Sequence, residues 1–89
     1  MRVVILGKYY EWLFCKMDLK KDWGECDPPN KKHKQIRIAE GLSEIDELDT
    51  SLHEMLHPAD HDKTEEWVDE LATDMARILW KLGYRRVKN

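Results

Sequence analysis

The sequence lacks the features that mark several large classes of protein. It holds only two cysteines, Cys15 and Cys26, which are too few for a disulfide framework, so we expect both to be reduced. The longest apolar runs, residues 3–6 and 12–15, have the length of strands, which excludes a membrane-spanning helix. Neither a long apolar stretch nor a small-residue cleavage site follows Arg2, which argues against a secretory signal. We therefore expect a cytoplasmic protein that does not bind membranes.

A strong excess of one charge sign is also lacking. Lys and Arg number 15 and Asp and Glu number 18, which gives a formal net charge of -3 at pH 7. This balance gives no electrostatic case for binding nucleic acid. With 42% hydrophobic and 37% charged residues, the 89 residues are typical of a single globular domain spanning residues 1–89. A domain of this size buries only about two-thirds of its unfolded surface, so a bound metal would matter for its stability.

The first 40 residues have the patterns of β-strands. Residues 2–6 are rich in β-branched side chains and end at Gly7, and residues 9–17 follow with aromatics and alternating polarity, so the two segments are predicted to form a hairpin. Residues 22–30 are dense in turn formers and are predicted to be a loop. Residues 35–39 alternate in polarity and are predicted to be a third strand, in which residues 35–38 are a candidate edge for pairing with an extended peptide.

From Ser43 onward the sequence has helical periodicity. Ser43 followed by Asp46 gives a capping start, and apolar residues recur at helical spacing until Pro58 ends the first helix. Thr64 is the predicted N-cap of a second helix that ends at Gly83. The predicted fold is α+β, with a small three-stranded antiparallel sheet packed on two helices in the order βββαα.

The first predicted helix ends in the most specific motif of the chain, His53-Glu54-Met55-Leu56-His57. Residues four apart lie on one helical face, so His53 and His57 can present two imidazoles to a single Zn²⁺. Glu54 is rotated one position further toward the open side, close enough to take a proton from a water at the metal. The motif therefore predicts a zinc site with Glu54 as the general base.

A catalytic zinc site of this type needs a third protein ligand. The candidates are four residues that follow the motif in the sequence: His61, Glu65, Glu66 and Asp69. His61 lies four residues after His57, but Pro58 breaks the helix that would align the two. Glu65 shares the helical face of the apolar stripe, so periodicity alone favours it. Glu66 lies toward the rim of the same helix, which is an acceptable position for a ligand in a cleft.

These residues resemble the zincin metallopeptidases, and specifically their glutamate-ligand (gluzincin) branch. In that branch the third ligand is a glutamate on the next helix, with an acid four residues later and apolar residues two and five residues later. Glu66 has Val68, Glu70 and Leu71 at those offsets. The resemblance therefore implies that Glu66 is the third ligand and that Glu70 orients one imidazole. Glu65 and His61 remain the alternatives.

The order of elements is also similar to that of minimal phage-encoded metallopeptidase-like proteins, and more distantly to SprT-like and ImmA/IrrE-like domains, over nearly the whole chain. The histidine-ligand branch is excluded, because Asp60 and Lys63 stand where its glycine and its last histidine would be. The resemblance implies a zinc-dependent peptidase with an unidentified peptide or protein substrate. The alternative is a metal-stapled accessory or interaction domain without significant turnover, in which His61 or Asp69 closes the coordination sphere.

Overall fold

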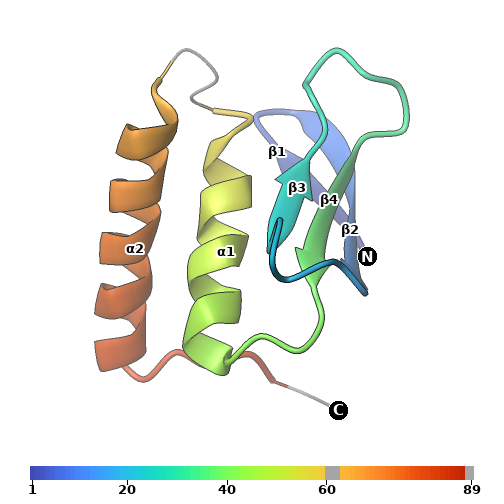
Figure 1. The fold of residues 1–89 in the computed structure, drawn as a ribbon. Helices are drawn as coiled ribbons and strands as arrows, with labels where there is room; N and C mark the ends of the chain where they lie inside the picture. The colour runs from blue at the N-terminus through green and yellow to red at the C-terminus, as the bar shows by residue number, and fades with distance from the viewer. Residues whose placement is uncertain (60–62, 88–89) are drawn as a thin grey trace.

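The structure is a computed structural model that describes residues 1–59 and 63–87, and its strands precede its helices (Figure 1). The strands are β1 (Arg2–Ile5), β2 (Lys8–Cys15), β3 (Gly24–Cys26) and β4 (Gln35–Ala39). The helices are α1 (Glu44–Leu56) and α2 (Glu65–Lys81). The predicted α+β class with two helices is confirmed, but the sheet has four strands and is mixed, so the prediction of three antiparallel strands was wrong.

The strand that sequence reasoning missed, β3, also reverses the direction of the strand that follows it. The order across the sheet is β1-β2-β4-β3. β1 and β2 form the predicted antiparallel hairpin, closed by Leu6 and Gly7 at φ of 49° and 76°, the positive values that a tight two-residue turn requires. β4 is antiparallel to β3 and therefore runs parallel to β2, with Trp12 opposite Ile36. The predicted third strand, residues 35–39, is consequently central, and β3 forms the edge.

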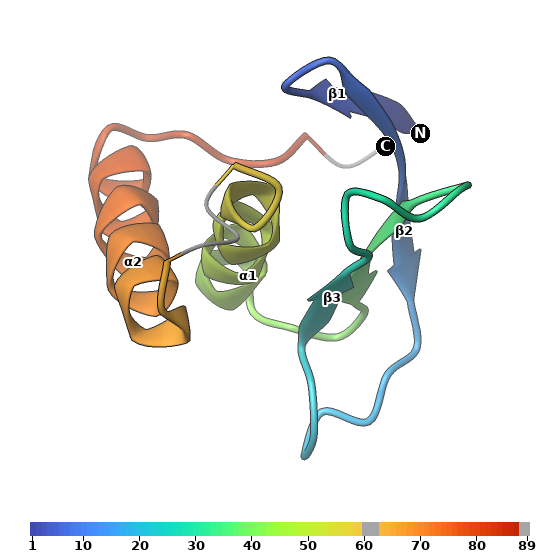
Figure 2. The ribbon, with the colours of Figure 1, turned by 90° about the horizontal axis from the view of Figure 1, so that it is seen from above.

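α1 lies between the sheet and α2, as the two views in Figures 1 and 2 show. One face of the sheet is buried under α1, with Met55 of the helix packed against the following buried side chains: Tyr10, Trp12, Ile36 and Ile38. On its other side α1 packs against α2 through Leu52, Ala72 and Ala76. The two alanines are fully buried, and their small side chains allow the helix axes to approach closely.

The ends of both helices are those that the sequence predicted. The Ser43 hydroxyl accepts a hydrogen bond from the Asp46 backbone N–H at 3.3 Å, and the Thr64 hydroxyl accepts one from Trp67 N–H at 3.1 Å. Gly83 has a φ of 91° and follows the last turn of α2, which is the conformation that favours glycine after a helix. Neither helix, within the described residues, is long and apolar enough to cross a membrane.

Asp27 holds the long connection between β3 and β4 onto the sheet. Its carboxylate is 6% exposed and accepts hydrogen bonds from the Gln35 backbone N–H at 2.9 Å, from Arg37 Nη2 at 3.0 Å and from Lys31 Nζ at 3.3 Å. The hydrogen bond from Arg37 is the main reason why the pKa of Asp27 is lowered to about 2. Asp27 thus folds as a buried anion with all its partners in place.

We predict that Asp27→Asn lowers the free energy of unfolding by about 2 kcal/mol at pH 7, because it removes charge-assisted hydrogen bonds from a buried position. An aspartate in the unfolded chain has a pKa of about 3.9. Since the folded pKa is lower, the stabilisation is present above pH ~4 and is lost as the pH falls through about 2. Urea unfolding at several pH values measures this. The exposed Glu40→Gln is the matched control, and an undiminished difference at the acid end would refute the charge-based explanation.

Candidate metal centre

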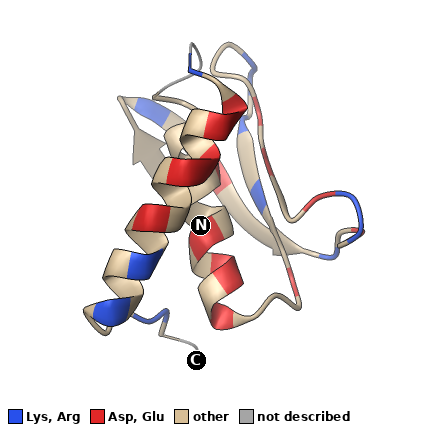
Figure 3. Cartoon of the chain, turned by 60° about the vertical axis from the view of Figure 1, so that its left-hand side comes forward, with Lys and Arg blue, Asp and Glu red and all other residues tan. Residues whose placement is uncertain are grey.

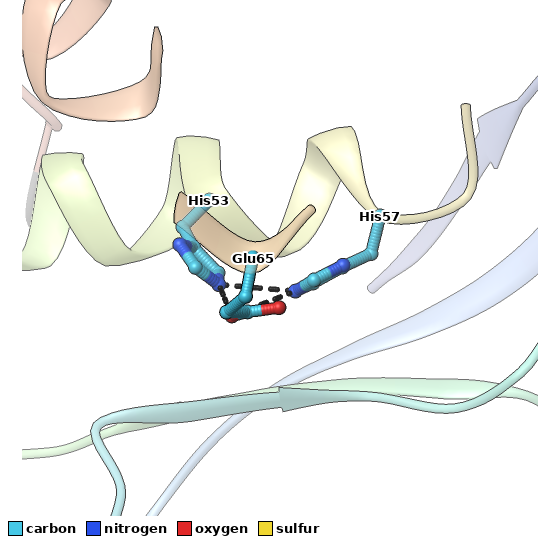
Figure 4. Close-up of side chains that lie close together, drawn as sticks. All are labelled: His53, His57 and Glu65. Atoms are coloured by element: carbon cyan, nitrogen blue, oxygen red, sulfur yellow. Dashed lines mark hydrogen bonds and ion pairs between the residues drawn. The ribbon is translucent and has the colours of Figure 1, made fainter. Parts of the chain in front are cut away.

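The last two turns of α1 bring His53 and His57 onto one face, as the four-residue spacing predicts (Figure 4). Their Nε2 atoms are 3.0 Å apart, and the two rings meet edge to face. The side chain of His53 is mostly buried, whereas that of His57 is more open to solvent. The core therefore holds the imidazoles in place, while the facing nitrogens remain near the surface.

The first residue of α2, Glu65, completes the group. Its Oε1 lies 2.7 Å from His53 Nε2 and 3.5 Å from His57 Nε2 (Figure 4). Because α2 runs antiparallel to α1, its N-terminal turn lies beside the C-terminal turn of α1. The three ligand atoms all lie within 4.8 Å of one another. Ligands of a tetrahedral zinc ion lie about 3.3 Å apart, so this group has the spacing to hold a metal ion.

The geometry favours Glu65 over Glu66 as the third ligand. Glu65 is in helical phase with the buried side chains of α2, Val68, Ala72 and Ala76, and so faces α1. Glu66 is rotated by one residue, is exposed, and is not part of the group. The structure thus groups the two histidines with Glu65, the residue that periodicity favoured, and not with Glu66, which the resemblance implied. The remaining alternative, His61, lies outside the described residues.

Asp69 takes the place predicted for Glu70. Its Oδ1 lies 2.7 Å from His53 Nδ1, the ring nitrogen that does not face the other histidine. A proton on Nδ1 shared with this carboxylate leaves Nε2 with a free lone pair, the tautomer that metal ligation requires. Glu70 is exposed and forms no ion pair with either histidine in the described part of the chain. The pair in contact with the histidines and the pair that the resemblance implied thus differ by one residue, because Asp69 follows Glu65 by four positions as Glu70 follows Glu66.

A third contact of the same kind lies one turn further along the helix pair. The Thr73 hydroxyl donates a hydrogen bond to Asp49 Oδ2 at 2.9 Å. Steps of four residues on each antiparallel helix thus give three successive polar pairs, which we call the polar seam: Asp49–Thr73, His53–Asp69 and His57–Glu65. Asp49 therefore helps to align the two helices that carry His53, His57 and Glu65.

Glu54 is buried beneath the edge strand rather than directed to an open side. It is 5% exposed, and Gly24 of β3 lies directly against it: a Cβ at that position would stand 3.0 Å from Glu54 Oε2 and 2.8 Å from Thr50 Cγ2. Its Oε1 is 3.9 Å from His57 Nε2. Burial is the main reason why the pKa of Glu54 is raised to about 7; the nearby His53 acts to lower this pKa, and the charges of Glu65, Glu25 and Asp22 raise it further.

A cleft of about 860 Å³ lies between the edge strand and the helices. One wall is β3 with the segments on either side of it, and the other is formed by α1 and the start of α2. Cys26 lies on the strand wall as a free, half-buried thiol, and its burial raises its pKa to about 12. The thiol is therefore protonated and unreactive at neutral pH, and the expectation of reduced cysteines agrees with both being free.

The C-terminal residues Tyr84 and Arg85 lie away from this cleft. Arg85 stacks on the Trp80 ring at 3.2 Å and donates a hydrogen bond to the Trp80 carbonyl, which caps the end of α2 opposite to the one that carries Glu65. These two residues therefore close a helix end and do not contribute to the cleft.

Comparison of the chain with protein-family models, with curated proteins and with solved structures gave no significant match. The interpretation of the cleft therefore rests on its own residues.

We predict that Glu65→Gln lowers the affinity for Zn²⁺ at least ~100-fold, because a neutral amide replaces an anionic ligand. The matched change at the neighbouring position, Glu66→Gln, is expected to alter the affinity less than ~3-fold. Competition with a chromophoric chelator measures both values. A larger loss in the Glu66 variant would restore the original choice of ligand.

The contact of Asp69 with His53 predicts a second, smaller effect. We expect Asp69→Asn to weaken zinc binding by about 10- to 100-fold through loss of the oriented imidazole, while Glu70→Gln leaves it unchanged. The same titration applies, and circular dichroism of the metal-free variants checks that the fold is intact. Equal affinities for the two variants would remove Asp69 from the site.

Proposed function

We propose that this chain is a zinc-dependent peptidase with a zincin-like site. The observation that carries the proposal is the convergence of His53, His57 and Glu65 beside a buried glutamate, Glu54, at the edge of a cleft. Two imidazoles and one carboxylate are a donor set that suits zinc in catalytic sites, whereas structural zinc sites are dominated by thiolates. Neither cysteine belongs to the group.

Zinc held by these three residues would supply Lewis acidity, which acidifies water and polarises a peptide carbonyl. The protein's own contribution begins with Glu54. Its carboxyl group lies 3.9 Å from His57 Nε2, beside the proposed ligands, where it can accept a proton from water and return it to the departing amine. Gly24 lies against Glu54, so the carboxyl group stays under the strand and away from bulk water.

The edge strand supports a peptide as the substrate. β3 is paired with β4 on one side only, and β3 lines the cleft opposite the helices. An extended peptide can add to such an edge through backbone hydrogen bonds, which hold it without regard to most of its side chains. This is the role that the sequence suggested for residues 35–38, now transferred to Gly24–Cys26.

The alternative, a metal-stapled interaction domain without turnover, draws on the same geometry. The ligands join the end of α1 to the start of α2, so a bound ion would stabilise the helix pair whatever else it did. In the peptidase the metal would keep an open position for water beside Glu54, whereas in the interaction domain a fourth protein ligand would close the coordination sphere.

We predict that Glu54→Gln binds zinc within about threefold of the parent protein but hydrolyses an unstructured protein such as casein at least ~1000-fold more slowly. Glutamine has the shape of glutamate, so the packing against Gly24 is retained. Hydrolysis is followed by fluorescent peptide release and metal content by elemental analysis. Undiminished cleavage in the variant would refute the role of Glu54, and a zinc-loaded parent protein without cleavage would support the interaction domain.

A further inference from the structure

The cleft beside the metal centre carries an excess of acidic side chains. The helical wall contributes Asp49, Glu54, Glu65 and Asp69. The strand wall contributes Asp22, Glu25 and Asp27. Only Lys21 and Arg37 among the lining residues are cationic side chains. Seven carboxylates thus face two cations, so the lining remains net negative even with a divalent ion bound.

Part of this negative charge is already neutralised by neighbouring cations. Arg37 Nη2 lies 2.9 Å from Glu25 Oε2 and 3.0 Å from Asp27 Oδ1, and Lys31 adds a further ion pair to Asp27. Glu65 belongs to the metal-binding group. These three carboxylates therefore offer little to a charged substrate.

Two other carboxylates of the lining, Asp22 and Asp49, have no cation paired with them in the described part of the chain. The partner of Asp49 is the neutral hydroxyl of Thr73. Asp22 forms no ion pair with the part of the chain that the structure describes. Asp22 precedes Gly24 by two residues, and Gly24 contacts Thr50, the neighbour of Asp49. The two aspartates therefore belong to facing walls of the cleft.

The outer surface of α2 extends the negative field beyond the cleft. Its acidic residues occupy the turns nearest the metal centre, and its basic residues, Arg77 and Lys81, lie at the far end (Figure 3). Glu66, Glu70 and Asp74 recur every four residues and are all exposed. Like charge gathered around a cleft attracts a ligand of the opposite sign and raises its rate of encounter.

We propose that the cleft selects basic peptides, with a lysine or arginine side chain of the substrate held between Asp22 and Asp49. The open edge of β3 accounts for binding of a peptide backbone, and the two aspartates on facing walls account for the charge of the side chain that enters beside it. The inference rests on the proposed peptidase function, because it names the substrate class of that same cleft.

The test uses the zinc-loaded Glu54→Gln protein and measures binding, so that its outcome does not depend on catalysis. Three peptides of one length carry lysine, the uncharged isostere norleucine or glutamate at a single central position. We expect the lysine peptide to bind about tenfold more tightly than the norleucine peptide at low salt, and the glutamate peptide more weakly than either. The preference should shrink at high salt, where charges are screened over shorter distances.

Variants then locate the selectivity. Asp22→Asn is expected to reduce the preference for lysine over norleucine several-fold with little change in the affinity of the norleucine peptide. Glu40→Gln makes the same charge change on an exposed residue that does not line the cleft, and should leave the preference intact. Equal binding of all three peptides, tighter binding of the glutamate peptide, or no binding at all would overturn the proposal. Absence of cleavage by the parent protein together with the lysine preference would instead reject only the peptidase.

Discussion

The register of α2 against α1 decides whether His53, His57 and Glu65 come together at all. The histidines are fixed on α1 by their four-residue spacing, but the carboxylates reach them only because the helices meet with Asp49 opposite Thr73, His53 opposite Asp69 and His57 opposite Glu65. A slip of one helical turn, about 5.4 Å, would move every carboxylate of the polar seam past its partner. The buried contacts of Leu52 with Ala72 and Ala76 oppose such a slip, so apolar packing holds the polar group together.

The second constraint is the close approach of β3 to α1. Glu54 becomes a buried acid because a strand without a side chain at residue 24 lies on it. The edge strand β3 does not contain any of the three grouped residues. It covers Glu54 and forms the second wall of the cleft. The histidines and Glu65 draw on the helix pair alone, whereas the proposed chemistry needs the sheet as well.

Sequence reasoning succeeded where the signal is local. The caps Ser43 and Thr64, the end of α2 before Gly83 and the shared face of the two histidines all follow from residues a few positions apart. The choice between Glu65 and Glu66 as the third ligand does not follow from such local signals. The two residues differ only by a rotation about the axis of α2, and each has an acid four residues later. Only the contact with α1 separates them, and periodicity carried that information better than the resemblance did.

β3 escaped prediction for a different reason. Its three residues lie among turn formers and are too few to show alternation, so residues 22–30 have the pattern of a loop. Missing one reversal of the chain changed the expected direction of β4 relative to β2 and left Glu54 uncovered. A short strand thus altered the topology and the setting of the proposed base, although almost every other element was placed correctly.

The shortness of β3 also limits the length of a peptide that could pair with it. Three residues of strand span only about 10 Å, so the backbone ladder available to a guest chain is two or three residues long. Pairing over so few residues suits a flexible terminus or an unfolded loop and not the interior of a folded protein.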